Sequence, residues 1–501
     1  MSSGTGFDVI VIGSGIGGLV CAALLGRQGL RVCVLEKNPQ IGGALQTYAR
    51  DKVLFDAGVH YMGGLAPGQN LYQIFRYLGV LEDLKLARMP EEAFDKVLIG
   101  GDPNEYVFAQ GYERFEQTLT ASFPGEAAGI RAYAGAIRDV CSRFPLYNLR
   151  AGGVYEEKAG VLELDAKTTI DSFTTDPVLR EVLAGNNILY AGEPHKTPFY
   201  IHALVLNSFI ESSWKCMDGG GQLAKVLAHA IRAQGGVVRT RAEVTAIAKG
   251  SVTLTDGTVV HAPKIVSGLH PSTTLTLTDD PLLKPAFRNR VASLENSVSC
   301  FCVNLVLRPG AVPYVPHNYY YHRRGCAWTM ADYTPEDWPR GYALFYAPSR
   351  TDPAYAASIT LMTYMRYTDT GDWVDTVNTV AAPGERGAGY GAFKETHYRR
   401  LMDCVAEKFP GLEPAVTHWY ASTPLSFRDY LGAPEGTLYG ISKDYRDPVR
   451  TIIPARTKVE GLFLTGQSLN LHGILGAAIS SLATCADLLG RDDFVDQIRL
   501  A

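Results

Sequence analysis

Residues 7–36, FDVIVIGSGIGGLVCAALLGRQGLRVCVLE, decide the fold of this 501-residue chain. The β-branched run at 7–12 is typical of a strand buried in a parallel sheet, and it enters a glycine-rich turn at 13–18. An apolar segment follows up to Gly29, and residues 31–35 have the pattern of a second buried strand. The order strand, glycine turn, helix, strand predicts a complete βαβ unit.

The glycines of this unit have separate physical roles. Gly13 permits a tight turn, Gly15 leaves room for a pyrophosphate, and Gly18 lets the helix pack closely on the strand. The start of the helix offers free N–H groups and the positive end of its dipole to phosphates. Glu36, at the end of the second strand, is placed to accept hydrogen bonds from the hydroxyls of an unphosphorylated ribose. The unit therefore predicts a dinucleotide site.

A glycine pair soon after the ribose acid favours FAD over a nicotinamide cofactor. Beyond Glu36 the chain continues KNPQIGGALQT, which places Gly42 and Gly43 directly before Ala44. A nicotinamide domain would normally enter its next helix here. A glycine loop instead lets the backbone fold over a larger cofactor, so we expect FAD.

Further parts of a cofactor domain lie far along the chain. Residues 217–275 predict a glycine-capped helix, a strand, a hairpin that turns at Asp256-Gly257, and a returning strand. Backbone around Val244 would reach an adenine ring, with an ordinary surface hairpin as the alternative. Residues 461–490 predict a buried strand that breaks at Gly466, then a helix of small residues. Both ends of the chain are thus expected to build one site.

These segments predict an α/β protein with a Rossmann-type FAD-binding domain of the glutathione reductase-like, two-dinucleotide-binding type. We assign residues 1–65, 215–275 and 445–501 to this domain. Residues 66–214, helical in pattern, and 276–444, richer in strands, are expected to form one interleaved α+β substrate domain. The glycines of RGAGYG at 386–391 follow no strand, so a flexible loop is expected there rather than a nicotinamide site.

Composition excludes several classes of partner. Lys and Arg number 47 against 51 Asp and Glu, so no excess of positive charge is available for nucleic acid. No apolar run is long enough to span a membrane, which leaves at most a peripheral contact. The start resembles a strand rather than a signal peptide, and the nine cysteines form no disulfide or metal framework. We expect a cytoplasmic protein without a metal.

The motifs resemble those of the phytoene desaturase, carotenoid isomerase and retinol saturase superfamily of flavoproteins. The resemblance is carried by the glycine turn with Glu36, by FDAGVHYMGG at 55–64, by TPLSFRDYL…GTLYG at 423–440 and by GLFLTGQSLNLHGILGA at 461–477. The second and third of these are most similar to the retinol saturase branch. Relatives often carry an arginine or a small polar residue at the position of Ala44, and many have a proline where this chain has His472.

The resemblance implies a flavin that moves hydride to or from a conjugated carbon chain, or isomerises such a chain. The protein then has to fix geometry and exclude water. Residues 186–214 and 314–328 are rich enough in aromatic and aliphatic side chains to line a tunnel for such a substrate, although ordinary core packing explains them equally well. The electron donor is not identified by any motif.

Reduction of a C=C bond also needs a proton, and His60 is the first choice of donor. Tyr61, Arg428, Tyr430 and Tyr439 lie in motifs that should face the flavin, and His472 either borders the isoalloxazine or starts a helix. The residues expected to bind the cofactor are Gly13, Gly15, Ile16, Gly17, Gly18, Glu36, Lys37, Gly42, Gly43, Ala44, Leu45, Val244, Gly466, Gln467, Gly473, Leu475 and Gly476.

Three functions remain open at this point. The first is an oxidoreductase for polyenes such as retinoids, carotenoids or aryl polyenes, acting most plausibly as a reductase, with desaturation and isomerisation as alternatives. The second is a flavin amine oxidase. The third is a lipid escort protein without catalysis, which the complete set of phosphate and ribose contacts disfavours.

Overall fold

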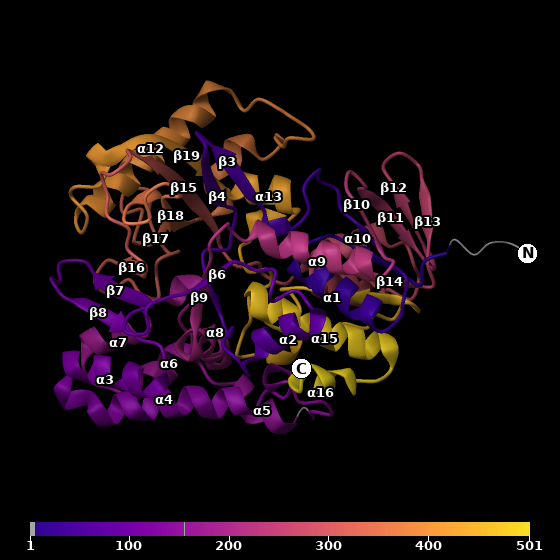
Figure 1. Ribbon diagram of the computed structural model, residues 1–501, viewed down its shortest axis with the longest axis horizontal. Coiled ribbons are helices and arrows are strands. Elements are labelled where there is room, and N and C mark those ends of the chain that lie inside the picture. The colour runs from indigo at the N-terminus through magenta and orange to yellow at the C-terminus, as the bar shows by residue number, and fades with distance from the viewer. Residues whose placement is uncertain (1–5, 155) are drawn as a thin grey trace, which may run out of the picture.

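The structure is a computed structural model that describes residues 6–154 and 156–501, so the first five residues of the predicted cofactor domain lie outside the described residues. A five-stranded parallel sheet forms one half of the molecule, on the right of Figure 1. Its strands, in the order β10-β2-β1-β14-β20, are β1 (Val9–Ile12), β2 (Val32–Leu35), β10 (Val237–Arg239), β14 (Lys264–Ser267) and β20 (Leu462–Leu464).

Alternation along β1 explains why this sheet is covered on both faces. Val9 and Val11 pack against α1 (Ile16–Arg27), α9 (Gly221–Ala233) and α15 (Gly473–Leu489). Ile10 and Ile12 face the opposite way, toward a three-stranded antiparallel sheet of β11 (Val244–Ala248), β12 (Ser251–Leu254) and β13 (Val259–His261). The central strands β1 and β2 are apolar and buried on both sides, as a buried parallel strand requires. The predicted Rossmann-type, glutathione reductase-like fold is confirmed.

A second sheet of seven strands dominates the other half of the molecule, in the order β19-β15-β18-β17-β16-β7-β8. Its strands are β7 (Asp95–Ile99), β8 (Glu105–Phe108), β15 (Ser299–Leu307), β16 (Asn318–His322), β17 (Gly341–Pro348), β18 (Ala356–Met365) and β19 (Val416–Ser422). Neighbouring strands are antiparallel except for β16 and β7.

Helices cover both faces of this sheet (Figure 1). One face, here called the inner face, packs in a single apolar cluster against α3 (Tyr112–Ser122), α4 (Ala127–Ser142), α6 (Ala166–Asp171), α7 (Pro177–Leu183) and α8 (Phe199–Glu211). The outer face packs against α12 (Gly387–Ala406).

Short elements connect the two halves. They include η1 (Gly43–Leu45), the hairpin of β3 (Thr47–Arg50) and β4 (Val53–Asp56), a small sheet of β5 (Met62–Gly63), β6 (Leu86–Arg88) and β9 (Ser213–Cys216), and the helices α2 (Asn70–Leu78) and α13 (Pro424–Leu431). The remaining helices are α5 (Glu156–Leu162), α10 (Pro271–Leu277), α11 (Pro285–Ala292), α14 (Pro448–Thr451) and α16 (Phe494–Arg499). In the described part of the chain no helix is both long and apolar enough to cross a membrane.

Three expectations about the substrate half need correction. The block 66–214 is not only helical, because β7 and β8 join strands of the later block in one sheet. The glycines of RGAGYG do not form a flexible loop, since α12 begins at Gly387. Successive side chains of β16, within 314–328, point to opposite faces of the sheet. Tyr320 therefore lies on the inner face, whereas Tyr319 and Tyr321 lie on the outer face and cannot line a tunnel on the inner one.

Candidate functional site

The start of α1 is built from close backbone contacts that leave one opening. A Cβ on Gly18 would lie 2.1 Å from the carbonyl oxygen of Gly13, and a Cβ on Gly17 would lie 2.8 Å from Cα of Gly466. A Cβ on Gly15 would meet no heavy atom within 4 Å. The helix start is therefore pressed against the last strand, with open space directly at Gly15. This is the arrangement that a bound pyrophosphate needs.

Glu36 ties the glycine turn to the loop that follows β2. Its Oε2 accepts hydrogen bonds from the Ser14 amide at 3.0 Å and the Ser14 hydroxyl at 2.6 Å, and its Oε1 accepts from the Asn38 amide at 2.9 Å. The Ser14 hydroxyl in turn accepts from the Gly42 amide at 3.0 Å. The buried carboxylate oxygens keep further lone pairs for hydroxyl donors. The residues present thus fit a ribose and a pyrophosphate.

The segment before β11 lies beside this acid. The Ala242 amide donates to the carbonyl oxygen of Glu36 at 2.8 Å, and Val244 begins β11 two residues later. The backbone near Val244 is thereby held at the ribose end of the opening. Its contact with an adenine ring stays a prediction.

The glycine pair closes the opposite side of the opening. Gly42 and Gly43 have positive φ angles of 119° and 56°, and a Cβ on Gly43 would lie 3.2 Å from Cα of Gly15. Ala44 is exposed, whereas Leu45 is buried in the same apolar cluster as β1 and Ile16 packs against that cluster. These residues border the opening at Gly15, and their contacts with a cofactor remain predictions.

The start of α15 lies next to that of α1. The Ser481 hydroxyl donates to the carbonyl oxygen of Gly17 at 2.8 Å, which joins the two helices directly. Gly466 has a φ of 104°, and Gly473 is the first residue of α15. A Cβ on Gly476 would lie 2.5 Å from the carbonyl carbon of Leu471. The two predicted helix starts from opposite ends of the chain therefore face one region.

The loop before α15 is held to the substrate half by polar contacts. The amide of the Gln467 side chain donates to the carbonyl oxygen of Leu438 at 3.2 Å. The buried ammonium of Lys443 donates to the carbonyl oxygens of Thr451, Ser468 and Leu469 at 2.7 to 2.9 Å. All three of its hydrogens are thus used, two of them on this loop and the third on the end of α14 (Pro448–Thr451). Leu475 packs against the clusters of both halves.

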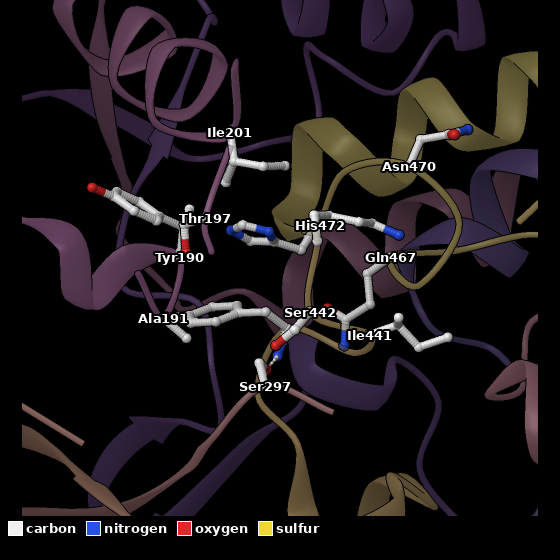
Figure 2. A pocket seen from close by; sticks show the side chains of 12 residues that line it. Tyr190, Ala191, Thr197, Ile201, Ser297, Ile441, Ser442, Gln467, Asn470 and His472 are labelled. Carbon is white, nitrogen blue, oxygen red and sulfur yellow. Dashed lines mark hydrogen bonds between the residues drawn. The ribbon is translucent and has the colours of Figure 1, made fainter. Parts of the chain in front are cut away.

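His472 projects into a small enclosed cavity beside this loop, which Figure 2 shows with its lining residues. Its Nε2 lies 3.0 Å from the carbonyl oxygen of Leu189, so this nitrogen carries the hydrogen. Burial lowers the pKa of His472 to about 4, which leaves the ring neutral and Nδ1 as an acceptor. The Tyr439 ring lies 4.5 Å from it, and the Tyr439 hydroxyl donates to the carbonyl oxygen of Ile188 at 2.8 Å.

The cavity measures about 20 Å³, which suits a single water rather than a long substrate. Tyr190 and Ile201, from the aromatic stretch 186–214, line it together with Lys443. This cavity is therefore too small to be the tunnel that the sequence predicts. What the structure does provide is a continuous apolar cluster over the inner face, to which Leu471 and Tyr61 both belong.

His60 and Tyr61 lie between the cofactor loop and the inner face. The His60 ring stacks on Phe345 of β17 with centroids 4.3 Å apart, and burial together with the Lys215 ammonium lowers the pKa of His60 to about 4. The Tyr61 hydroxyl donates to Oδ2 of Asp95 at 2.8 Å and lies 2.7 Å from the Tyr320 hydroxyl.

Arg428 and Tyr430 both lie on α13, which contacts other segments than His60 and Tyr61 do. The Arg428 guanidinium donates to the Tyr367 hydroxyl at 3.0 Å and to the carbonyl oxygens of Val374 and Thr376. Two side chains that follow Glu36 donate to the backbone of α13. The Lys37 ammonium donates to the carbonyl oxygen of Asp429 at 2.9 Å, and the Asn38 side-chain amide donates to that of Tyr430 at 2.8 Å. The described part of the chain gives these residues no partner in common with His60 or His472. The predicted catalytic set is therefore split, and Lys37 points its ammonium at α13.

Sequence reasoning missed three buried charged residues of this region, namely Asp95, Lys215 and Lys443. Asp95 begins the strand FDKVLI, and an acid inside such an apolar run is the signal that could have found it. Cys300 and Cys302 share the inner face as expected from their spacing, and burial raises the pKa of both thiols. This agrees with a packing role.

The chain belongs to the flavin containing amine oxidoreductase family, whose pattern matches residues 16–489. All-trans-retinol 13,14-reductase of Homo sapiens is 28% identical over 98% of this chain and 86% of its own length. The chloroplastic prolycopene isomerase of Daucus carota is 25% identical over 98% of this chain and 81% of its own length. The solved structure of a putrescine oxidase triple mutant has a TM-score of 0.64 at 14% identity, covering 97% of this chain and 99% of that one. The chain is thus a relative of retinol saturase and carotenoid isomerase in a flavin-containing family.

Proposed function

We propose that this protein is an FAD-dependent oxidoreductase that reduces a C=C bond of a long, conjugated, lipophilic polyene. The observation that carries the proposal is the shared apolar cluster. Leu471 of the loop before α15 and Tyr61 of the loop after β4 pack on one face of the seven-stranded sheet, together with Phe345 and Tyr364. A hydrophobic chain bound against this cluster would be shielded from water.

The chain's own residues divide the work between binding and chemistry. The opening at Gly15, the Glu36 carboxylate and the start of α15 are suited to hold FAD. FAD, when bound, supplies a centre that can give or take a hydride. The apolar cluster excludes water, and the fixed Nε2–H of His472 leaves Nδ1 as an acceptor. The Tyr61 hydroxyl holds a proton at the edge of the cluster.

The contacts of Asp95 disfavour the amine oxidase alternative. A carboxylate that paired with the ammonium group of an amine substrate in this cluster would have to be free of other partners. Both oxygens of Asp95 are already engaged, Oδ2 with Tyr61 and Oδ1 with the Asn318 amide at 2.9 Å. The Lys215 ammonium of the chain itself also stabilises the carboxylate form of Asp95.

The deciding experiment mixes dithionite-reduced protein anaerobically with retinoids, carotenoids, aryl polyenes or common amines. Flavin reoxidation together with loss of the polyene's long-wavelength absorption supports reduction. A changed isomer pattern with the flavin still reduced would make the protein an isomerase, and turnover by the oxidised form alone would make it a desaturase. A preference for amines would overturn the proposal in favour of an amine oxidase.

The absorption spectrum of the purified protein tests the cofactor separately. We expect a yellow protein that releases FAD on denaturation. A colourless protein that cannot be reconstituted with FAD would favour a lipid escort without catalysis.

A further inference from the structure

Asp95 is a fully buried carboxyl that the fold places beside Tyr61. β16 pairs with β7 in parallel with Asn318 opposite Asp95, and Tyr320 follows two residues later on the same side. β5 pairs with β9 with Met62 opposite Trp214, which sets Lys215 next to Tyr61. Three separate segments thus converge on one carboxyl, and nothing in their local sequence requires this.

The groups around Asp95 suit both of its protonation states. Burial raises the pKa of Asp95 to about 7, although hydrogen bonds from Asn318 and Tyr61 oppose this. The carboxylate form is supported by the same two donors and by the Lys215 ammonium, whose pKa burial lowers to about 8. The other groups near this pair are the Asn186 side chain, Tyr320, and His60 and His317 on the Lys215 side.

Protonation of Asp95 reverses the direction of its contact with Tyr61. When the carboxyl carries a proton, the 2.8 Å contact becomes a donation from Asp95 to the Tyr61 oxygen. The Tyr61 hydroxyl is then released to donate to a second partner. Tyr320 is one such partner at 2.7 Å, and a substrate carbon in the apolar cluster would be another.

Tyr61 is also tied to the cofactor side of the molecule. Its loop packs on η1, where a Cβ on Gly58 would lie 3.3 Å from the carbonyl oxygen of Ala44. At its other end a Cβ on Gly63 would lie 2.5 Å from the backbone of Ser208 in α8. The loop therefore spans the distance from the glycine pair to the apolar cluster with little freedom to move.

We propose that Tyr61 delivers the proton of the reaction and that Asp95, acting through Tyr61, stores and replaces it. This inference rests on the proposed function. FAD, when bound and reduced, would supply a hydride to one carbon of the substrate double bond, and the Tyr61 hydroxyl would give its proton to the other carbon. As the Tyr61 O–H bond breaks, the Asp95 O–H bond breaks and a new Tyr61 O–H bond forms. Asp95 ends as a carboxylate facing Lys215 and regains a proton from solvent between turnovers.

The test compares wild type with Asp95→Asn and Tyr61→Phe. Asp102→Asn is the matched control, because Tyr106 donates to this buried carboxyl at 3.1 Å within the same β7–β8 hairpin, away from Tyr61. The first readout is infrared spectroscopy of the protein without flavin. We expect the carbonyl stretch of protonated carboxyls to titrate near pH 7, to lose the Asp95 component in Asp95→Asn and to keep it in Asp102→Asn. Asp56, whose pKa burial also raises to about 7, contributes a remaining signal in all three proteins.

The second readout is the rate at which the reduced holoenzyme converts the polyene in a single turnover. Asp95→Asn and Tyr61→Phe should each slow conversion about 100-fold or more, the scale of general acid catalysis, with polyene binding unchanged. The wild-type rate should fall as pH rises through 7, whereas the rate of Asp95→Asn should not respond to pH in this range. Asp102→Asn should keep both the wild-type rate and its pH profile.

The outcomes separate the two proposals. A wild type that converts a polyene alongside an equally fast Asp95→Asn with the same pH profile overturns the proton store and leaves the proposed function standing. A carboxyl titration above pH 5 that is the same in wild type and in Asp95→Asn also overturns it. A wild type that converts no polyene overturns the proposed function instead. If Asp95→Asn does not fold, Tyr61→Phe decides, because it leaves Asp95 in place.

Discussion

The two halves of the molecule fix their functional residues in opposite ways. In the cofactor half, backbone lies against backbone, as where a Cβ on Gly17 would come within 2.8 Å of Gly466. In the substrate half, polar side chains such as Asp95 and Tyr61 meet inside an apolar cluster. At such contacts the first half has no room for an added atom, whereas the second half depends on pairs of polar groups. Substitutions should therefore fail for different reasons in each half.

The largest effect is expected at Gly18. Gly18→Ala would place a Cβ 2.1 Å from the carbonyl oxygen of Gly13, and only movement of the backbone could relieve this contact. We expect little folded protein by circular dichroism. Gly15→Val is the control, because Gly15 faces open space, and it should fold normally but lose its flavin. A Gly18→Ala protein with wild-type melting behaviour would show that the comparison is wrong for the cofactor half.

The same contrast explains what the sequence could predict. Residues 7–36 form strand, turn, helix and strand in immediate succession, so their periodicity and glycine spacing reveal the unit locally. The helix from Gly473 and the hairpin at Gly257 were predictable for the same reason. By contrast, the contact between Asp95 and Asn318 joins residues 223 apart. No local pattern encodes that β7 pairs with β16.

The catalytic candidates were only partly predictable. Short motifs pointed to His60, Tyr61 and His472. Tyr61 is buried in the apolar cluster, and the two histidines are half-buried beside it. The motif TPLSFRDYL also pointed to Arg428, although its guanidinium is occupied by backbone carbonyl oxygens of residues 374–376. A motif shows that a segment is important, but the direction of each side chain depends on tertiary packing.

The next largest effect is on stability and its pH dependence. The pKa of Asp95 is raised by burial to about 7, so the unfolded chain ionises this group at lower pH than the folded protein does. Its contribution to stability is therefore present at acid pH and is lost as pH rises toward 7. Asp95→Asn lacks this loss. Relative to wild type, it should gain a few kcal/mol, on the order of 1.4 kcal/mol per pKa unit, between pH 4 and pH 8.

Denaturant unfolding at several pH values measures this difference, with Asp102→Asn as the control. If the free energy of unfolding of wild type and of Asp95→Asn changed with pH in the same way, the pKa of the Asp95 carboxyl would be the same in the folded and the unfolded protein. The substrate half would then not depend on a buried polar network.

A smaller effect is expected for Glu36, where the cofactor half uses a side chain. Glu36→Gln keeps the size of the group but removes the charge that accepts hydrogen bonds at the ribose end. The affinity for FAD should fall by about 1.5–3 kcal/mol, the value of a charged hydrogen bond. Flavin binding to stripped protein measures this loss. Glu243→Gln, at an exposed position just before β11, should bind FAD like wild type, and equal loss in both variants would contradict the assignment.

The smallest effect is expected at Arg428, where sequence and structure disagree most. Its guanidinium holds residues 367–376 through the Tyr367 hydroxyl and two carbonyl oxygens, and it also pairs with Asp429 at 2.8 Å. A lysine cannot reproduce this fork, so Arg428→Lys should lose about 1 kcal/mol of stability. The rate of polyene conversion should change less than about twofold, because the guanidinium is already used to position residues 367–376. Melting temperature and single-turnover rate should be measured on the same preparation. A large fall in rate with an unchanged melting temperature would mean that Arg428 acts on the substrate. Helix α13 would then belong to the reacting site rather than to the ribose end.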